Sequence, residues 1–524
     1  MPAPSLSLYT QPMNLTTAQL AAVMAPGSKR LIVAGPGSGK THTTVAAILH
    51  DIQDDPAAAG RVICITFTNR AAHELRTRLA ARGVTPYHVG TLHSLALRMA
   101  GRVALLDEGG AADLLAETIA SLRSKATPTG CRSVLAGERT AYAAEMPVVA
   151  AYRKALQQAG AADYDTILTD ALESAPGFKT PGGWLLYVDE FQDSAPIDIK
   201  IYDALDCERR WVVGDGDQCI FEFRGANADS MAALARRPGW NVSYLNDNFR
   251  SGVRIVLAAQ QVIQHNANRL AVPQDCHRVE MGAVLLDTFK TAAEELAHLV
   301  RTVTQSEGQW AILCRYNVQR KEIEDELRAA GAGLAVPMAP PPRDQRSTLA
   351  LLAVLANPES RLAHRAYWRA TLTPSEAQRK AESGELLPKT WPDRFETWDA
   401  LASFLAGRMV STTMLRRLHS AYLRAGTLDP ALLSAAMGSR YDVDLIPAKV
   451  TVLTQHAAKG LEFDNVWIPG ADVATTSNDP DADRRLFYVA MTRARETLRI
   501  TQAQHRRNAH TNRMEERLAC PWIS

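Results

Sequence analysis

The sequence lacks paired cysteine motifs: its seven cysteines are scattered, and no two are spaced as C-x-x-C. This scatter argues against a zinc site and a disulfide framework, and it favours a reducing, cytoplasmic compartment. No apolar run approaches the roughly 18 residues that a membrane-spanning helix needs, so we expect no membrane partner. The first 15 residues contain no basic region followed by an apolar core, so we expect no signal peptide.

An excess of charge is also missing. The net charge is +2 over 524 residues, so total charge does not predict a nucleic-acid partner, and any basic surface must be local. The hydrophobic content of 46% and the charged content of 22% are typical of a globular protein. The length predicts about three or four domains.

One segment carries a strong chemical signature. Three apolar residues, 31–33, run into a glycine-rich turn that ends in Lys40-Thr41, and an alanine-rich, helix-forming segment follows. This strand–loop–helix pattern predicts a phosphate-binding loop in which backbone N–H groups surround the phosphates, Lys40 reaches the terminal phosphates and Thr41 ligates Mg²⁺. The predicted loop comprises Ala34, Gly35, Pro36, Gly37, Ser38, Gly39, Lys40 and Thr41. The pattern usually begins with glycine, and the alternative is an ordinary glycine-rich turn.

Two later strands end in polar residues that suit the same site. The apolar run 184–188 ends in Asp189 and Glu190, which predicts a carboxylate that holds Mg²⁺ and a second one that polarises the attacking water. The alternative is a charged turn. The run 210–214 leads to Gln218, whose neutral amide is suited to contact a γ-phosphate. Gln19, upstream of the loop, has an amide that suits an adenine edge, but taken alone it is more typical of an exposed helix residue.

Aromatic and basic residues follow other predicted strands. The run 61–67 ends at Phe67, and the short strand 88–90 is followed by His93, at the sheet edge where ligands bind. A core aromatic and a satisfied turn histidine are the alternatives. Phe221, Phe223 and Arg224 form an aromatic–basic cluster close to Gln218, which predicts stacking on nucleic-acid bases.

The remaining segments predict a helical insertion in the first block and then a second α/β block. Residues 95–180 are alanine-rich with helical spacing and predict a helical insertion, whose basic residues belong either to a solvated face or to a surface that follows a nucleic-acid backbone. From about residue 285 a strand (283–287), a helix (292–306) and a strand (310–314) follow, and the block resumes at 449 with strands 449–453 and 465–468, a helix (484–495) and a last strand (498–501). Residues 345–445 predict a second helical insertion.

Taken together, these segments resemble a compact superfamily 1 DNA helicase of the UvrD/Rep/PcrA type. The segments that carry the resemblance occur in the family's order: A-G-P-G-S-G-K-T, T-F-T-N-R-A-A, T-L-H-S, V-D-E-F-Q-D, V-G-D-G-D-Q, F-R-G-A, N-F-R-S, T-Q-H-A-A-K-G-L-E-F and Y-V-A-M-T-R-A-R. The resemblance implies an α/β fold with two RecA-like P-loop domains, each with a parallel sheet and a helical insertion. The expected division is 1–94 with 181–250, insertion 95–180, 251–344 with 446–505, insertion 345–445, and a basic tail 506–524.

The resemblance also implies roles for individual residues. Arg250 and Arg493 are expected to be arginine fingers that act with Lys40, Glu190 and Gln218 in catalysis, while Asp189 and Thr41 hold Mg²⁺. The residues expected around the ATP base and sugar are Gln19, His42, Phe249 and Glu462. Those expected along the DNA path are Phe67, Asn69, Arg70, Thr91, His93, Phe221, Phe223, Arg224 and His456.

The expected activity is ATP-dependent 3′→5′ movement along single-stranded DNA with unwinding of 3′-tailed duplex, by a chain that is a monomer in isolation. Phe223 stands where the family commonly has tryptophan, Phe249 where it usually has tyrosine, and His42 where it often has arginine. The alternatives are a single-strand translocase without robust unwinding and a nucleic-acid-binding adaptor without ATPase activity. The second alternative conflicts with the presence of the complete set of predicted catalytic residues.

Overall fold

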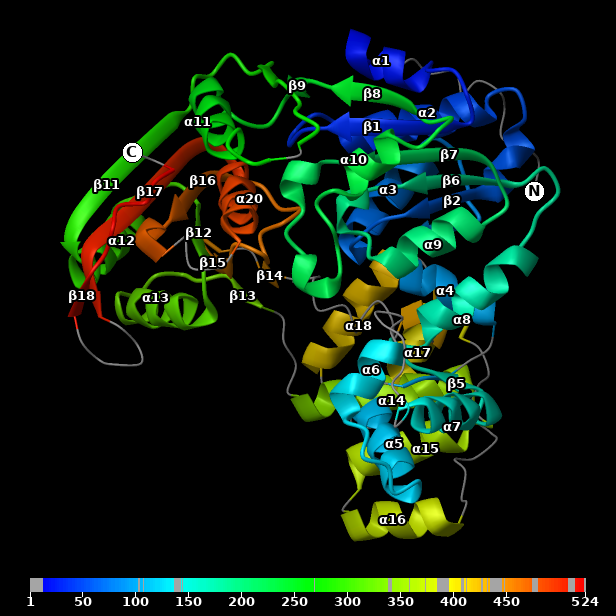
Figure 1. Ribbon diagram of the computed structural model, residues 1–524. Coiled ribbons are helices and arrows are strands. Elements are labelled where there is room, and N and C mark those ends of the chain that lie inside the picture. The colour runs from blue at the N-terminus through cyan, green and yellow to red at the C-terminus, as the bar shows by residue number, and fades with distance from the viewer. Residues whose placement is uncertain are drawn as a thin grey trace.

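The computed structural model shows two parallel β-sheets, each covered by helices, and a third, helical lobe (Figure 1). The structure describes residues 13–101, 104–106, 108–135, 143, 145–267, 269–337, 342–357, 359–372, 374–383, 395–406, 410, 412–425, 427–430, 432–433, 445–446, 448–473, 479–507 and 514–522. No helix within these ranges is long and apolar enough to cross a membrane.

The first sheet has the strand order β3-β2-β6-β7-β1-β8, and all of its strands are parallel. Its strands are β1 (Lys29–Ala34), β2 (Val62–Ile65), β3 (His88–Gly90), β6 (Trp184–Val188), β7 (Cys207–Gly214) and β8 (Asn241–Leu245). Side chains alternate between the two faces, as the period of a strand requires. Leu31 and Val33 enter one apolar core, and Ile32 and Ala34 enter the other.

Helices cover both faces of this sheet. The helices on one face are α1 (Thr17–Val23), α2 (Lys40–Ile52) and α3 (Asn69–Ala80). Those on the other are α4 (Leu92–Ala100), α8 (Ile167–Ser174), α9 (Pro196–Ala204) and α10 (Ser230–Ala235). The predicted insertion 95–180 therefore includes most of α4 and all of α8, which pack on the sheet itself. The apolar side chains of these two helices cause this packing. The alanine-rich composition of residues 95–180 did not distinguish these helices from the helices of the insertion.

The second sheet has the order β11-β17-β16-β12-β15, with β18 antiparallel to β17. Its strands are β11 (Ala283–Thr291), β12 (Trp310–Cys314), β15 (Val450–Thr454), β16 (Phe463–Ile468), β17 (Ala494–Arg507) and β18 (Met514–Glu516). Helices α11 (Val253–Ile263) and α20 (Pro480–Met491) cover one face, and α12 (Ala292–Gln305) and α13 (Asn317–Ala329) cover the other.

Three sequence-based segments in this block have wrong boundaries: the helix 484–495, the last strand and the tail. The helix expected over 484–495 runs from Pro480 to Met491, because Asp479 caps its N-terminus and Pro480 occupies its first turn. Arg493 therefore follows the helix, and β17 begins at Ala494 rather than at 498. Part of the predicted tail is also strand, since β17 extends to Arg507 and pairs with β18. Arg513, which also belongs to that tail, lies outside the described residues.

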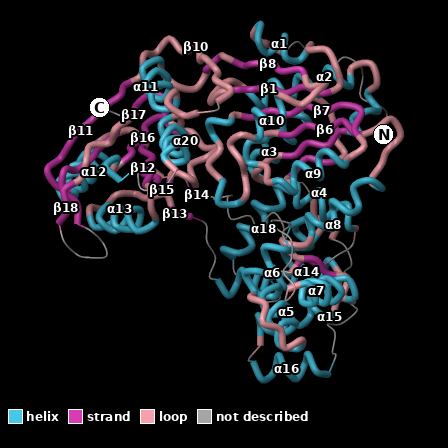
Figure 2. Tube along the Cα trace, viewed as in Figure 1, coloured by secondary structure: helices cyan, strands magenta, loops and turns pink. Residues whose placement is uncertain are grey.

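The helical lobe is built from both predicted insertions, which pack against each other (Figures 1 and 2). The first contributes β4 (Ala104–Leu105), α5 (Glu108–Ser121), α6 (Pro128–Leu135), α7 (Met146–Gln158) and β5 (Ala161–Ala162). The second contributes α14 (Pro342–Ala356), α15 (Arg361–Thr371), α16 (Pro374–Ser383), α17 (Trp398–Ala406) and α18 (Thr412–Ala425). Short strands β13 (Val336–Pro337) and β14 (Leu445–Ile446) pair where the chain leaves and re-enters the second block.

A small ribbon joins the two sheets near the phosphate loop. Strand β9 (Asp247–Asn248) continues from β8 and pairs with β10 (Asp275–Cys276), which lies in the connection from α11 to β11. Phe249 and Arg250 follow β9 directly. The ribbon thus places residues of the connection beside the first sheet.

Candidate nucleotide site and nucleic-acid interface

The phosphate loop joins the end of β1 to the start of α2, so backbone N–H groups and the helix N-terminus face the same point. Gly37 and Gly39 have φ angles of 70° and 78°, in the left-handed region that favours glycine. A Cβ added at Gly37 would stand 2.7 Å from Arg250 Cβ, and one at Gly39 would stand 2.8 Å from Gln19 Nε2. Glycine is therefore required here both by backbone angle and by close neighbours.

Lys40 folds over the loop. Its Nζ donates to the carbonyl oxygens of Ala34 and Gly35, both at 3.3 Å, and Ser38 Oγ donates to Gly35 O at 2.7 Å. The ammonium group therefore lies against the loop, which is consistent with the phosphate contact predicted for Lys40. Thr41 is half-buried in the first turn of α2.

Gln19 is buried at 2% exposure, so the exposed-helix interpretation is wrong. Its Nε2 donates to Ser38 O at 3.1 Å, and its Oε1 accepts from the backbone N–H of Thr16 in a capping box. The capping geometry of α1 thus aims the amide at the phosphate loop. The adenine contact predicted for Gln19 is consistent with this placement.

Asp189 and Glu190 follow β6 at the carboxyl edge of the first sheet. Glu190 has a φ of 53°, an unusual angle for a residue other than glycine, and its carboxylate accepts from Gln192 Nε2 at 2.6 Å. Burial and the Glu190 carboxylate together raise the pKa of Asp189. Burial alone would raise the pKa of Glu190 as well, but the ammonium groups of Lys40 and Lys459 outweigh it and lower that pKa.

These two acids differ in protonation tendency, as expected of neighbours with different tasks. Glu190 stays ionised, which suits a group that polarises water. Asp189 lies where a further positive charge would favour its ionised form. Mg²⁺ is typically held by one or two protein oxygens, waters and substrate phosphates, and the Asp189 carboxylate with the Thr41 hydroxyl fits that donor set. The described residues contain no group of three or more metal-ligating side chains.

Gln218 lies at the junction of the two sheets. Its Nε2 donates to Asp215 Oδ2 at 2.7 Å, and its Oε1 accepts from Arg493 at 3.2 Å. Its backbone carbonyl accepts from Lys459 Nζ at 2.6 Å. The predicted γ-phosphate sensor is therefore held by one group of the first block and two groups of the second.

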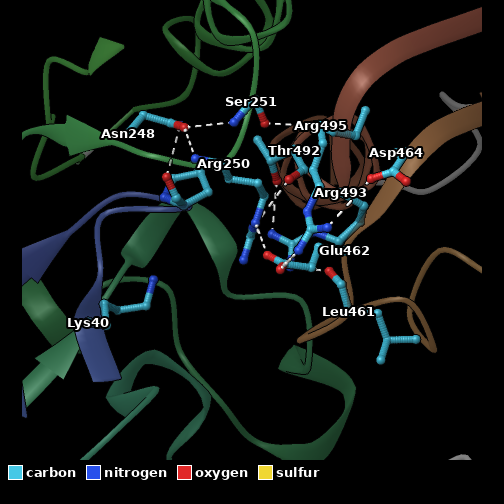
Figure 3. Close-up of polar contacts among 12 residues, drawn as sticks. Lys40, Asn248, Arg250, Ser251, Leu461, Glu462, Asp464, Thr492, Arg493 and Arg495 are labelled. Carbon is cyan, nitrogen blue, oxygen red and sulfur yellow. Dashed lines mark hydrogen bonds and ion pairs between the residues drawn. The ribbon is translucent and has the colours of Figure 1, made fainter. Parts of the chain in front are cut away.

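Both predicted arginine fingers lie at this junction (Figure 3). Arg493 is buried at 2% exposure and also donates to Val489 O and Leu461 O. Burial, followed by the nearby Arg250 guanidinium, lowers the pKa of Arg493 to about 9. Arg250 donates to Glu462 Oε2 at 2.7 Å and to Thr492 O at 3.3 Å. In Figure 3 Lys40 lies apart from these arginines.

The residues predicted around the base and sugar lie on different segments. Phe249 is 43% exposed, and its ring lies 4.8 Å from that of His277. His42 Nε2 lies 3.2 Å from Asn14 O. Glu462 forms ion pairs with both Arg250 and Arg495, so a ribose contact would require this carboxylate to exchange partners.

An aromatic cluster lies beside Gln218. Phe67 stacks on Phe221 at 4.7 Å, and Phe223 lies 5.9 Å from Phe221 and 5.7 Å from His456. Phe223 is 69% exposed, whereas Phe221 is only 2% exposed. The prediction that Phe221 stacks on bases is therefore wrong for this structure: it supports Phe67 and Phe223 from below. The guanidinium of Arg224 lies 5.4 Å from the Phe67 ring.

The histidines of the predicted DNA path are neutral. Burial, with the Arg315 and Lys459 charges, lowers the pKa of His456 to about 4. Burial and the Arg224 charge likewise lower the pKa of His93 to about 4, and its ring lies 5.7 Å from Tyr164. Neutral imidazoles suit stacking or hydrogen bonding rather than phosphate pairing.

The other predicted DNA contacts follow the ends of β2 and β3. Asn69 is buried at 6% exposure in the first turn of α3, and Arg70 beside it is exposed. Thr91 caps α4 by accepting from Ser94 N at 3.3 Å. Burial leaves Asn69 less available for DNA than Arg70.

Sequence reasoning assigned no role to several residues of the junction. Lys459 forms a 2.6 Å ion pair with the buried Asp193. Arg485, on α20, donates to Glu222 Oε2 at 2.8 Å and to Cys219 O at 3.1 Å. Lys459 lies within the motif T-Q-H-A-A-K-G-L-E-F, and Arg485 lies in the helix predicted over 484–495. Their positive charge within these segments is the sequence signal that could have identified them.

The fold and site define a P-loop nucleoside-triphosphatase with two sheets and arginines supplied across their junction. Two family models match the chain: the UvrD/REP helicase N-terminal domain over residues 15–106 and 113–238, and the UvrD-like helicase C-terminal domain over residues 428–505. The chain belongs to the UvrD/REP helicase family.

Several curated relatives match nearly the whole chain. The ATP-dependent DNA helicase PcrA of Leuconostoc citreum is 24% identical over 95% of this chain and 83% of its own length. The ATP-dependent DNA helicase UvrD2 of Mycobacterium bovis is 27% identical over 96% and 80%. DNA helicase II of Salmonella typhimurium is 26% identical over 94% and 85%.

Proposed function

We propose that this chain is an ATP-dependent DNA helicase that moves 3′→5′ along single-stranded DNA and unwinds 3′-tailed duplex. The observation that carries the proposal is the contact of Arg493, from the second block, with Gln218 of the first, next to the exposed aromatic Phe223. A nucleotide sensor, a charge donor and a base-stacking surface thus lie within one connected set of residues. We refer to 13–101 with 181–250 as the first motor domain, and to 251–337 with 448–507 as the second.

The chemistry expected at the site is phosphoryl transfer to water. Lys40 and the loop N–H groups hold the phosphates, Glu190 orients and polarises the attacking water, and Arg250 with Arg493 stabilises the charge that develops on the transferred group. Mg²⁺, when held by Thr41 and Asp189, supplies further charge neutralisation on the phosphates. Because the loop and both arginines come from one chain, a monomer suffices for catalysis.

The ATP site and the DNA surface are connected by α20. Arg493 follows the C-terminal end of this helix and contacts Gln218. The helix also carries Arg485, which donates hydrogen bonds to Glu222 and Cys219 near Phe223. A shift of α20 on nucleotide binding would therefore move both contacts together. Such coupled movement of two domains is the ordinary basis of a lid or hinge step.

The neighbours of Phe223 indicate how DNA is bound. The exposed Phe223 ring and the half-buried Phe67 ring offer base-stacking faces, while the nearby Arg224 offers a charge for phosphates. Stacking does not depend on base identity, which suits movement along any sequence. Arg70 and Thr91 extend the proposed path across the carboxyl edge of the first sheet.

Translocation without robust unwinding is the second candidate. It is favoured by Phe223, whose ring is smaller than the tryptophan common at this position, so it would separate base pairs less effectively. Strand displacement from a 3′-tailed duplex distinguishes the two candidates, because a pure translocase consumes ATP on the tail without releasing the paired strand.

The direct test of the proposed function is ATP hydrolysis measured with single-stranded DNA, with RNA and without nucleic acid. We expect DNA to stimulate hydrolysis, and Lys40→Ala to abolish hydrolysis while DNA binding persists. Arg328→Ala, on the exposed face of α13 and away from the site, is the control and should behave as wild type. DNA-independent hydrolysis, or full turnover by the Lys40 variant, would contradict the proposal.

A further inference from the structure

Gln274 lies in the connection between α11 and β11, outside every motif that sequence analysis identified. A Cβ added at Gly35 would collide with its amide nitrogen, so the amide rests directly on the phosphate loop. Lys40 Nζ contacts the same residue, since it donates to Gly35 O at 3.3 Å. The amide of Gln274 and the ammonium of Lys40 thus converge on Gly35.

Two hydrogen bonds fix the orientation of this amide. Gln274 Oε1 accepts from Asn248 Nδ2 at 2.9 Å, and Gln274 Nε2 donates to Tyr488 Oη at 3.2 Å. Asn248 Nδ2 also donates to Pro36 O at 2.9 Å, and Asn248 Oδ1 accepts from Arg250 N at 3.0 Å. The amide nitrogen therefore lies beside Gly35 and uses one hydrogen on Tyr488, with the other left for a further acceptor.

Tyr488 extends this arrangement towards the γ-phosphate sensor. It is buried at 2% exposure on α20. Burial, then the carboxylates of Asp215 and Asp217, raise the pKa of Tyr488 well above its usual value, so the phenol keeps its proton. Asp215 in turn accepts from Gln218 Nε2 at 2.7 Å. Gln274 is thus linked through Tyr488 to the surroundings of Asp215, the carboxylate that holds the predicted γ-phosphate sensor.

The loop itself lacks one donor at this point. Pro36 has no backbone N–H, so the turn between Gly35 and Gly37 offers one hydrogen bond fewer to a phosphate than a loop with another residue there. A side-chain amide held above Gly35 supplies a neutral donor beside the gap. Neutral donors bind an anionic oxygen without adding charge, and the resulting bond is stronger than one between neutral groups.

We propose that Gln274 is a specificity-determining residue whose amide N–H group binds the terminal phosphate of a nucleoside triphosphate and so distinguishes it from a diphosphate. The inference rests on the proposed ATP-driven function and adds a γ-phosphate contact from the connection between α11 and β11 of the second motor domain. On binding, Nε2 keeps Tyr488 as one acceptor and takes a phosphate oxygen as the other. Asn248 continues to hold the amide oxygen.

The test compares the affinities of ADP and a non-hydrolysable ATP analogue, each with Mg²⁺, by calorimetry on the full chain. For Gln274→Ala we expect the Kd of the analogue to rise roughly tenfold, since a hydrogen bond to a charged group is lost, while the Kd of ADP stays within about twofold. Gln274→Glu should weaken the analogue further because it places a carboxylate against the phosphate. Gln261→Ala, an exposed glutamine on α11, is the matched control.

The Kd values of ADP and of the ATP analogue distinguish a phosphate contact of Gln274 from a purely structural role. Equal weakening of both nucleotides would show that Gln274 only supports the loop, and an unchanged or tighter analogue would show that it makes no phosphate contact. Either result overturns the inference and leaves the proposed function standing. If the wild-type chain bound neither nucleotide, the proposed function itself would fail. Thermal unfolding of each variant checks that the fold is retained.

Discussion

Replacement of Arg493 is the most informative perturbation of the proposed mechanism. Arg493 is buried at the junction of the two sheets, and its guanidinium contacts Gln218 Oε1 at 3.2 Å. Arg493→Ala removes the guanidinium from the transition state of hydrolysis. Arg493→Lys keeps a positive charge but loses the planar fork that bonds several acceptors at once.

The expected loss is large. An arginine finger contributes roughly 10³–10⁵ in rate, which corresponds to about 4–7 kcal/mol of transition-state stabilisation. The side chain also donates to Val489 O and Leu461 O, and buried carbonyls left without a donor cost about 1–3 kcal/mol each in stability. The lysine variant limits that second effect, because an ammonium can still bond a carbonyl.

The assay is steady-state phosphate release with saturating single-stranded DNA, together with the Kd of ADP and the thermal unfolding midpoint of each variant. We expect kcat to fall by at least about 10³-fold for both variants, with the Kd of ADP within about threefold of wild type. Arg328→Ala should change none of these quantities. A folded Arg493 variant with kcat within about threefold of wild type would refute the assignment.

Three further predictions concern the stacking surface, the first core and the nucleotide grip. Phe223→Ala should weaken single-stranded DNA binding roughly tenfold, because stacking contributes about 1–3 kcal/mol per base. Phe221→Ala should instead lower the free energy of unfolding by about 3–5 kcal/mol. If both variants lost DNA affinity equally and Phe221→Ala kept its stability, the buried role of Phe221 would be contradicted. Burial, with the Arg98 charge, lowers the pKa of His88 to about 3, so its contribution to stability is complete above about pH 6.5 and is lost as the pH falls towards 3. At pH 5 the loss in the free energy of unfolding is about 2 kcal/mol. The thermal unfolding midpoint of His88→Gln should therefore depend less on pH between 7 and 5 than that of wild type. The same pH dependence of the midpoint in both proteins would count against this prediction. His42→Arg should bind nucleotide more tightly than wild type, because it places a guanidinium with a fixed positive charge where the imidazole stands; calorimetry that finds no gain in affinity for the arginine variant would disprove a role for this position.

The sheet strands were predictable because their apolar runs are short and bounded by polar or glycine residues. The run 310–314 matches β12, and the run 184–188 matches β6. The phosphate loop was predictable because its backbone requires glycine locally: Gly37 and Gly39 have φ angles in the left-handed region. In these segments the information is contained within a few neighbouring residues.

Contacts between distant segments were not predictable. The burial of Phe221 under Phe67 and Phe223 depends on how the loop after β7 meets β2 and α20, and nothing in its local sequence separates it from Phe223. Gln274 has no recognisable motif because its place above Gly35 is set by the pairing of β10 with β9. Taken alone, Gln19 is typical of an exposed helix residue, because glutamine is mostly found on protein surfaces, yet its capping box turns the side chain inwards.

The lobe shows the same limit on a larger scale. Alanine-rich composition predicted helices in both insertions, but their packing against each other is specified by partners about 250 residues apart, as in the ion pairs of Arg365 and Arg369 with Glu117. α8 resembles the lobe helices in composition but packs on the first sheet. Composition therefore predicts the type of element without its docking site.

Directional unwinding driven by ATP can be measured by strand displacement. Duplexes with a 3′ tail, a 5′ tail or blunt ends are incubated with the chain and ATP, and release of the labelled strand is followed over time, with Lys40→Ala as the inactive control. We expect release from the 3′-tailed duplex alone, and only by the chain with an intact Lys40. Release from the 5′-tailed duplex at an equal or higher rate, or release by the Lys40 variant, would contradict it.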